Sequence, residues 1–444
     1  MQKGEITAFL SLIFLLILSL LGAIIESASI QVLKNHKRAD TSLAVESVFA
    51  EYQKELLEEY DVFALDGSYG DRIWDERKLT RRLEYYGAQE NANKIQRSEL
   101  LTDNMGAPFY RQAVRYMENK IGIDHIDEDS SYWEEQEESG EDFEKAETEV
   151  QENLESMLEE TQESLPSENN PMESVSSIQK SNLLQIIVEN PEQLSEKSIK
   201  KEELASIRKL NRGKGNFMEK EKQNEVTGKL FFQKYLLEHF SDITQKKEKH
   251  ALDYELEYLI GGYESDQKNL EAVVKKILPI RLGINYAYLL TDESKKAEAE
   301  VLALSLCTLL TVPGITEVVK HAILMAWAYG EGLVDLRALV AGKKVPLVKN
   351  KENWNLQLSE LLRLGEHGVQ DSGQDSGEGM TYQDYLKGLL LLQDKETQSM
   401  RALDLIERNL NLKADHCVMR MEIESRCRLR HGVKYEFSTY FGYQ

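Results

Sequence analysis

The sequence has few cysteines and no recognisable catalytic motif. Its three cysteines, Cys307, Cys417 and Cys427, are too few for a disulfide framework and lack the paired spacing of a zinc site. Because their number is odd, at least one thiol is free or bonds to another chain. The eight histidines show no metal-ligand spacing, and no GxSxG, HExxH or kinase motif set is present. The sequence therefore predicts no catalytic residue, no metal and no cofactor.

Basic residues are almost absent from one acidic segment. The formal net charge is −23, but Asp124 to Glu173 holds 20 acidic residues and one lysine, so the rest of the chain carries only −4. Such a dense anion repels nucleic acid and anionic lipid headgroups, and we expect no nucleic-acid partner. Residues 124–177 also have a low apolar density. This composition predicts a disordered, solvating insert or a frayed helix.

Long apolar runs are lacking except at one place. Ile6 to Ile25 contains 20 consecutive uncharged residues, which as a helix span about 30 Å, the thickness of a hydrocarbon core. We expect these residues to cross a membrane, with Ile6, Phe9, Leu12, Leu16, Leu20 and Ile25 as spanning positions. The alternative is a cleaved secretory signal, but the run exceeds the usual length and Ser27–Ser29 is a poor cleavage site.

The direction of the span is set by competing signals. Lys34, Lys37 and Arg38 follow it, and by the charge rule alone they favour a body on the cytoplasmic side. Only Lys3 and Glu5 precede it, together with the α-amino group. The residues alone leave both directions open.

The apolar pattern continues beyond the span. Leu43, Val48, Phe49 and Leu56 recur at helical spacing with charged residues between them, and no proline interrupts residues 5–59. This pattern predicts one helix of about 55 residues, on the order of 80 Å long, with residues 1–30 as the anchor and 31–60 as an amphipathic stem. That shape is pilin-like.

The remaining segments predict a mainly α (α+β) protein. A short strand is expected at 60–66 and helices at 71–121, within a mixed segment 61–123. Residues 178–412 form the expected helical core domain, and 413–444 a C-terminal β-hairpin packed on the body of the protein. The core helices are expected at 226–242, 247–260, 267–278, 294–311, 315–340 and in a pair at 381–410, because Gly261-Gly262, Pro279 and Pro313-Gly314 punctuate them.

The hairpin prediction is specific about register. Apolar residues occupy odd positions from Cys417 to Leu429 and again from Val433. Only a three-residue loop at 430–432 keeps both strands in phase, pairing Cys427 with Tyr435 and placing Gly432 in the left-handed region. Cys417 and Cys427 then lie on one strand about 33 Å apart and cannot bond to each other.

Charged residues within the apolar core are the candidate site. They are Glu257, Arg281, Glu331, Asp335 and Arg337. Paired carboxylates act as acid and base when their environments separate their pKa values. A buried glutamate beside an arginine is equally typical of a structural ion pair. Structural ion pairs are the favoured interpretation, with partner binding and catalysis as alternatives.

Several motifs resemble a family of uncharacterised Gram-positive membrane-anchored proteins, a domain of unknown function. They are residues 3–12 (KGEITAFLSL), 46–66, 254–270 (YELEYLIGGYESDQKNL), 281–286 (RLGINY), 326–335 (AWAYGEGLVD), 342–347 (GKKVPL), Trp354 and 382–386 (YQDYL). The match covers most of the chain except the acidic segment. The N-terminus is similar to the minor pseudopilins of tight-adherence (Tad-type) pilus systems.

This resemblance implies a single-pass cell-membrane protein with an extracytoplasmic body and protein partners in a pilus or secretion assembly. It also implies a processing site at Gly4 and Glu5. Type IV pilins place a glutamate five residues after the processed glycine, but that position here is Phe9, which puts cleavage in doubt. The expected function is a non-enzymatic assembly component. The alternative is a membrane-tethered envelope hydrolase or substrate-binding protein.

Overall fold

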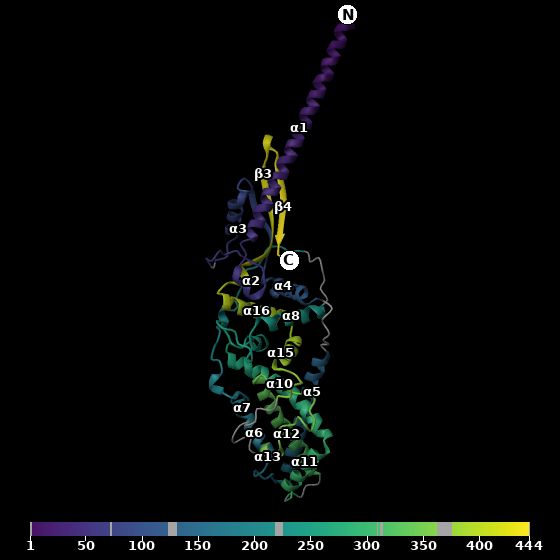
Figure 1. Ribbon diagram of the computed structural model, residues 1–444, viewed down its shortest axis with the longest axis vertical. Coiled ribbons are helices and arrows are strands. Elements are labelled where there is room, and N and C mark those ends of the chain that lie inside the picture. The colour runs from purple at the N-terminus through teal and green to yellow at the C-terminus, as the bar shows by residue number, and fades with distance from the viewer. Residues whose placement is uncertain are drawn as a thin grey trace. The chain divides into compact units, whose positions relative to one another are not determined.

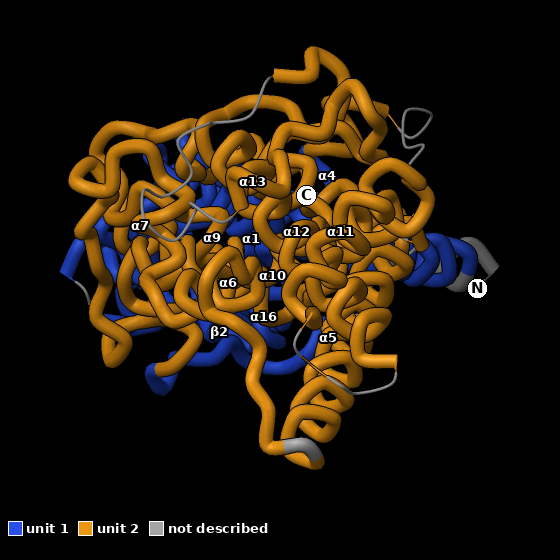
Figure 2. Tube along the Cα trace, turned by 90° about the horizontal axis from the view of Figure 1, so that it is seen from below, with its two compact units in different colours: residues 1–116, 208–222, 410–444 blue, residues 117–207, 223–409 orange. Residues whose placement is uncertain are grey.

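A computed structural model describes residues 2–71, 73–122, 131–217, 225–308, 310, 314–361 and 375–443. The chain forms two compact units, coloured separately in Figure 2. Unit 1 comprises residues 1–116, 208–222 and 410–444, and unit 2 comprises residues 117–207 and 223–409. The fold is mainly helical with one small antiparallel sheet, as the sequence predicts. Each unit draws on more than one of the predicted segments.

Unit 1 begins with a long helix, α1 (Gln2–Phe49), labelled in Figure 1. The predicted continuation to residue 59 is wrong, because the chain leaves the helix after Phe49 and a separate helix α2 (Lys54–Tyr60) follows. The backbone at Gln53 is extended, and its N–H donates to the carbonyl oxygen of Ala64 at 2.8 Å instead of to a preceding helical turn. The amphipathic stem is therefore shorter than the sequence pattern predicts.

The sheet of unit 1 is built around its longest strand. The strands are β1 (Leu65–Asp66), β2 (Ala92–Leu100), β3 (Cys417–Arg428) and β4 (Lys434–Gly442). Strand β3 pairs antiparallel with all three others, with β2 along one edge and β1 and β4 along the other. Within the mixed, mainly helical segment expected at 71–121, the sequence did not identify strand β2, where two register shifts disrupt the alternation typical of a strand.

The hairpin of β3 and β4 confirms the predicted register. Cys427 pairs with Tyr435, the N–H of Leu429 donates to the carbonyl oxygen of Val433 at 2.8 Å, and Gly432 has a φ of 76°. Cys307, Cys417 and Cys427 are buried free thiols. The hairpin belongs to unit 1, where β4 packs on α1.

The core of unit 1 lies between the second half of α1 and the sheet. Val45, Val48 and Phe49 are buried against Met421 and Ile423 of β3. Burying each such side chain stabilises the fold by about 1.5–3 kcal/mol. The remaining helices of this part of the chain are α3 (Glu76–Leu83), the turn at Glu84–Ala88, α4 (Asp103–Ile121), which leads into unit 2, and the short helices Ala414–His416 and Arg430–Gly432.

Unit 2 is a helical body. Its helices are α5 (Ser131–Thr161), α6 (Pro171–Gln179), α7 (Leu183–Ile187), α8 (Glu225–His239), α9 (Glu255–Gly261), α10 (Asp266–Thr291), α11 (Glu293–Leu306), α12 (Ile315–Val340), α13 (Leu358–Leu361), α15 (Tyr382–Leu391) and α16 (Lys395–Leu410), with short turns at Pro191–Gln193 and Lys201–Glu203. The predicted core helices are present, and α10 packs against α5, α9 and α12. Pro279, expected to end a helix, lies inside α10.

The acidic segment is not disordered over residues 131–161, where it forms α5. Trp133 and Phe143 are buried, and Gly140 lies so close to α10 that an added Cβ would stand 3.0 Å from the backbone of Pro279 and Ile280. Of the two predicted alternatives, disorder and a frayed helix, the helix is present there, because the few apolar and small residues of the segment recur at three- and four-residue steps. They form a narrow stripe that is enough to dock the helix on α10 and α12. Residues 123–130 lie outside the described part of the chain.

Candidate functional site

The first half of α1 is an exposed apolar helix. The predicted spanning residues are 59–66% exposed: Ile6, Phe9, Leu12, Leu16, Leu20 and Ile25. The helix is long and apolar enough to cross a membrane, and its most apolar stretch has no burial within the protein. An exposed apolar surface of this size favours insertion into lipid over contact with water. By length and composition, α1 could therefore insert in a membrane.

Polar side chains within this stretch are satisfied by the helix itself. The hydroxyls of Ser11 and Ser19 donate to the carbonyl oxygens of Ala8 and Leu16 at 2.8 and 2.9 Å, as expected for serines in an apolar helix. Gly4 and Glu5, the residues of the proposed processing site, have helical backbone, but their side chains lie outside the described residues.

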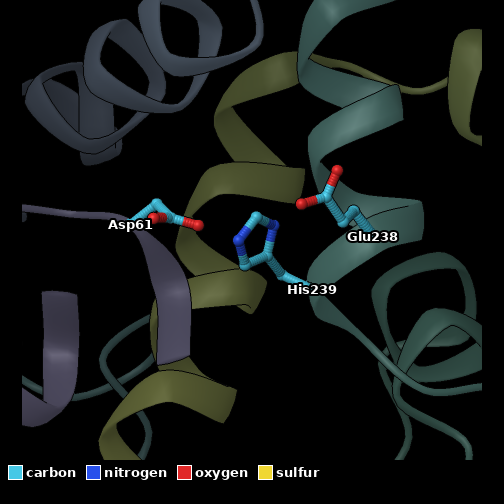
Figure 3. A group of neighbouring side chains, drawn as sticks. All are labelled: Asp61, Glu238 and His239. Atoms are coloured by element: carbon cyan, nitrogen blue, oxygen red, sulfur yellow. The ribbon is translucent and has the colours of Figure 1, made fainter. Parts of the chain in front are cut away.

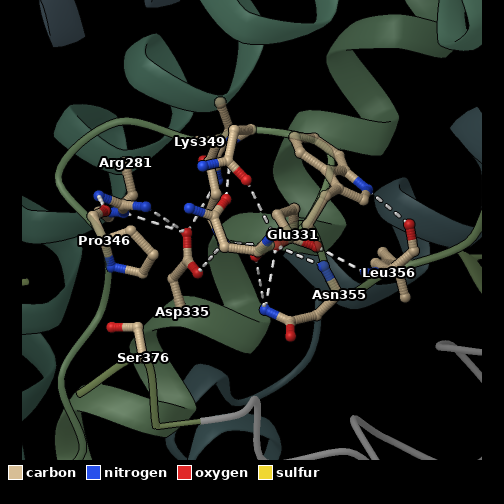
Figure 4. Close-up of polar contacts among 12 residues, drawn as sticks. Arg281, Glu331, Asp335, Pro346, Lys349, Asn355, Leu356 and Ser376 are labelled. Atoms are coloured by element: carbon tan, nitrogen blue, oxygen red, sulfur yellow. Dashed lines mark hydrogen bonds and ion pairs between the residues drawn. The ribbon is translucent and has the colours of Figure 1, made fainter. Parts of the chain in front are cut away.

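Three of the predicted core charges do meet, in a cluster within unit 2 that Figure 4 shows. Arg281 of α10 donates through Nε and Nη2 to Oδ2 of Asp335 of α12, at 3.1 and 2.8 Å. Its Nη1 donates to the carbonyl oxygen of Pro346 at 3.0 Å. Glu331 lies one helical turn before Asp335 on the same face of α12. Helices α10 and α12 therefore bring Arg281, Glu331 and Asp335 to one place.

The fourth charged member, Lys349, is one that sequence reasoning missed. Its Nζ donates to Oε1 of Glu331 at 2.5 Å and to Oδ1 of Asp335 at 2.7 Å, and its side chain is completely buried. It comes from the segment that follows α12, where it ends the apolar run 345–348. The apolar residues directly before Lys349 are the one feature of the sequence that hints at a buried rather than a solvated lysine.

The four charges of this cluster compensate one another. Burial alone would raise the pKa of Asp335, but the charges of Arg281 and Lys349 hold it below its usual value. Glu331 accepts further hydrogen bonds from the backbone N–H groups of Asn355 and Leu356, at 3.1 and 2.7 Å. A buried cluster with this many internal partners fastens the segment around residues 346–356 to α10 and α12. Its geometry is that of a structural clamp.

Glu257 and Arg337 stand apart from this cluster. Arg337 donates to the carbonyl oxygen of Ile186 at 3.2 Å. Glu257 is fully buried, and its Oε1 accepts from the N–H of Ile243 and from the hydroxyl of Tyr382, each at 3.0 Å. Burial, and then the nearby charge of Asp242, raise the pKa of Glu257 to about 8. At neutral pH this carboxyl group therefore carries a proton.

The raised pKa of Glu257 predicts that the stability of unit 2 depends on pH. In the unfolded chain this carboxyl returns to its ordinary pKa of 4.5, so between pH 4.5 and 8 the folded state holds a proton that the unfolded state has lost. The free energy of unfolding should fall as pH rises through that window, by up to about 1.4 kcal/mol per pH unit, and level off above pH 8. Urea unfolding midpoints measured from pH 5 to 9 test this slope.

A Glu257→Gln variant supplies the comparison. Glutamine keeps the accepting oxygen and never ionises, so this variant should lose most of the slope and exceed the wild-type midpoint at pH 8.5. Glu248→Gln, at an exposed position of the same unit, should keep the wild-type slope. Equal slopes in all three proteins would show that Glu257 ionises normally.

Figure 3 draws Glu238 and His239, which end α8, together with Asp61 of unit 1. The ring of His239 lies 4.2 Å from that of Tyr235, and its Nδ1 is 3.0 Å from the carbonyl oxygen of Tyr235. Glu238 pairs with Lys120 at 2.5 Å. Within unit 2, Glu238 and His239 therefore offer one stacked imidazole and one carboxylate that is already paired with a lysine. These are fewer ligands than the three or four that a protein metal site uses.

Comparison with known proteins gives one match. A model of a family of unknown function (DUF5702) matches residues 161–429, about three-fifths of the chain. The matched region contains Glu257, Arg281, Glu331, Asp335, Lys349 and Arg337, and it ends on the hairpin just after β3. No curated protein and no solved structure matches.

Proposed function

We propose that this chain, which belongs to the family of unknown function DUF5702, is a membrane-anchored, non-enzymatic component of a Tad-like pilus or secretion assembly. The observation that carries the proposal is the division of α1 into two functional halves. Residues 6–25 expose an apolar surface, while Ala44, Val45 and Val48 of the same unbroken helix are buried on the sheet of unit 1. A helix that is both anchor and core element suits a subunit that assembles at a membrane.

The same division supports a retained anchor rather than a cleaved signal. Helix α1 runs without interruption from the span through the cleavage candidate Ser27–Ser29 to Ala44 and Val45, which are buried in unit 1. The span is therefore the first half of a helix whose second half is part of the folded core.

The buried charges support a structural role over a hydrolase. Glu331 is saturated by Lys349 and two backbone donors, and Glu257 is buried without an anionic charge at neutral pH. Hydrolysis by a carboxylate pair needs a water and a substrate within hydrogen-bond reach of both groups. Neither carboxylate faces solvent, so we propose no second function.

The proposed location of the body is extracytoplasmic, as the resemblance of the N-terminus to pseudopilins implies. Lys34, Lys37 and Arg38 favour the opposite side by the charge rule. Protease added to intact cells distinguishes the two, since an external body is digested and an internal one is protected until the membrane is broken. If the body is protected from protease in intact cells, the extracytoplasmic location is wrong, but the proposed membrane anchor is not affected.

Membrane attachment should depend on the exposed apolar face of α1. Replacing both Leu12 and Leu16 with arginine places two charges in the span, at a cost of about 2.5–3.5 kcal/mol each. We expect this variant to move from the membrane fraction to the soluble fraction. Leu43→Arg combined with Ile73→Arg changes two equally exposed residues of unit 1 outside the span and should stay in the membrane. A soluble wild-type chain that lacks its first residues would instead indicate a cleaved signal.

The assembly role is tested by purifying the full chain in mild detergent. We expect it to co-purify with proteins that carry an N-terminal apolar helix like α1, or with a secretion ATPase, and the arginine double variant to lose them. A wild-type chain that is monomeric and alone after crosslinking in intact cells would overturn the assembly role.

A further inference from the structure

The tip of the hairpin lies beside α1 at the end of the apolar span. Ile30 and Leu33 of α1 pack with Leu429 on the hairpin, and Arg430 lines a hollow on α1 together with Ile25. His431 at the turn lies 3.6 Å from Glu26, the first charged residue after the span. In Figure 1 the turn between β3 and β4 points along α1 toward its N-terminus. The turn of the C-terminal hairpin thus reaches the level at which the span ends.

Cations gather at this place. Arg428, Arg430 and Lys434 surround the turn, are exposed, and make no ion pair within the described residues. On α1, Lys34 lies over the ring of Tyr435 at 5.4 Å and Arg38 over that of Phe437 at 5.9 Å. We call these five cations, Lys34, Arg38, Arg428, Arg430 and Lys434, the basic collar.

Few acidic groups compensate the basic collar. Glu26 faces His431, and Glu424 and Glu436 both pair with Arg426, further along the strands. Lys37 is already paired with Glu90. The basic collar therefore keeps most of its charge, although the protein as a whole carries a net charge of −23.

The three cations of the basic collar at the turn lie at the height of a lipid headgroup layer, whereas Lys34 and Arg38 lie further along α1. A bilayer has a hydrocarbon core of about 30 Å and headgroup layers of about 5–7 Å on each side. Residues 26–30 of α1 rise about 7.5 Å beyond the end of the span, the thickness of one such layer. Arg430, which shares a hollow with Ile25, and Arg428 and Lys434 on the neighbouring positions then lie at headgroup depth.

We propose that the basic collar binds anionic lipid headgroups where α1 leaves the bilayer, so that the C-terminal hairpin is docked on the membrane surface. This inference rests on the anchoring role of α1 proposed above. Clusters of lysine and arginine next to a span attract anionic lipid, each cation adding to the attraction. Lys34 and Arg38, held over aromatic rings of the hairpin, link the collar to the helix, so lipid binding also fixes the hairpin against α1.

The experiment measures amide hydrogen exchange of the full chain in nanodiscs of phosphatidylcholine alone or of phosphatidylcholine and phosphatidylglycerol in equal amounts. Docking should suppress fraying of the hairpin tip, so amides of residues 428–436 should exchange more slowly in the anionic nanodiscs, by at least about threefold. Arg428→Gln, Arg430→Gln and Lys434→Gln together should abolish the difference, and high salt should reduce it in the wild type.

A matched variant removes the same number of charges elsewhere in unit 1. Arg81→Gln, Lys94→Gln and Arg115→Gln are exposed substitutions away from the turn, and this variant should keep the wild-type response. In phosphatidylcholine all three proteins should exchange alike, which confirms that the variants fold. Equal exchange of the wild-type tip in both lipids overturns the collar alone. Failure of the chain to enter phosphatidylcholine nanodiscs overturns the anchor and the collar together.

Discussion

Replacing Lys349 with methionine is expected to destabilise unit 2 by about 3–5 kcal/mol, the cost of leaving a buried charge without its partner. Lys349 is the only cation that contacts both Glu331 and Asp335 among the described residues, because Arg281 reaches only Asp335. Without it, the carboxylate of Glu331 keeps the backbone donors of Asn355 and Leu356 and the weak contact of the Asn355 side chain, but no positive charge. Methionine fills a similar volume, so the loss is electrostatic rather than a cavity.

A second variant separates charge from packing. Glu331→Gln in the Lys349→Met background removes the uncompensated carboxylate and leaves Arg281 paired with Asp335, so it should recover a substantial part of the lost stability. Lys351→Met, two residues away and exposed, should change stability by less than about 0.5 kcal/mol.

Urea unfolding followed by tryptophan fluorescence measures these effects. Trp327 donates through Nε1 to the carbonyl oxygen of Leu356 at 2.9 Å, and the N–H of the same Leu356 donates to Glu331, so the emission of Trp327 reports on the clamp. If Lys349→Met and Lys351→Met have the same midpoint, the lysine is solvated and the cluster is not a clamp.

Most of this cluster could be predicted, because the signal is local. Glu331 and Asp335 interrupt an apolar helix four residues apart, which places both carboxylates on one face, and Arg281 interrupts another apolar helix. Lys349 could not be predicted, because it lies in an irregular segment and only the three-dimensional path of that segment buries it. Arg337 shows the converse error: it shares α12 but lies on a face that meets Ile186 rather than the carboxylates.

The strands show the same dependence on local signals. The register of β3 and β4 followed from a strict two-residue period and a glycine that permits the left-handed turn. Strand β2 has no such period, since bulges between Ile95 and Arg97 and between Glu99 and Leu100 shift its faces. The end of α1 was also missed, because the apolar pattern continues through Tyr52 although a bond from Gln53 to Ala64 ends the helix.

The acidic segment shows where composition misleads. Its charge density is typical of a disordered segment. Nevertheless, a stripe of about one apolar or small residue per helical turn is enough to hold α5 against α10 and α12, because the contacts are close. Gly283 of α10 allows the backbone of Ser139 to pack closely, because a Cβ added at Gly283 would lie only 2.8 Å from the carbonyl oxygen of Ser139. Charge on the outer face of α5 does not oppose this packing, because those carboxylates stay in water.

Trp133→Ala is therefore expected to destabilise unit 2 by about 3–5 kcal/mol, although the residue lies in a segment that composition would assign to disorder. The Trp133 ring meets that of Tyr385 at 5.6 Å and covers Gly388 of α15 so closely that an added Cβ would lie 2.2 Å from it. Glu134→Ala, the exposed neighbour on α5, should have little effect on the urea midpoint.

A second substitution, at Gly388, tests the contact between Trp133 and α15 directly. If α5 were disordered, the effects of the two substitutions would be independent. Gly388→Ala alone should destabilise unit 2 by about 1–3 kcal/mol, because its methyl group collides with the indole. In the Trp133→Ala background the same methyl group enters vacated space, so the double variant should be more stable than the sum of the single effects by more than about 0.5 kcal/mol. Additive effects in this double-mutant cycle would mean that Trp133 and Gly388 do not touch. A Trp133→Ala midpoint equal to that of the wild type would return the acidic segment to the role of a solvated linker.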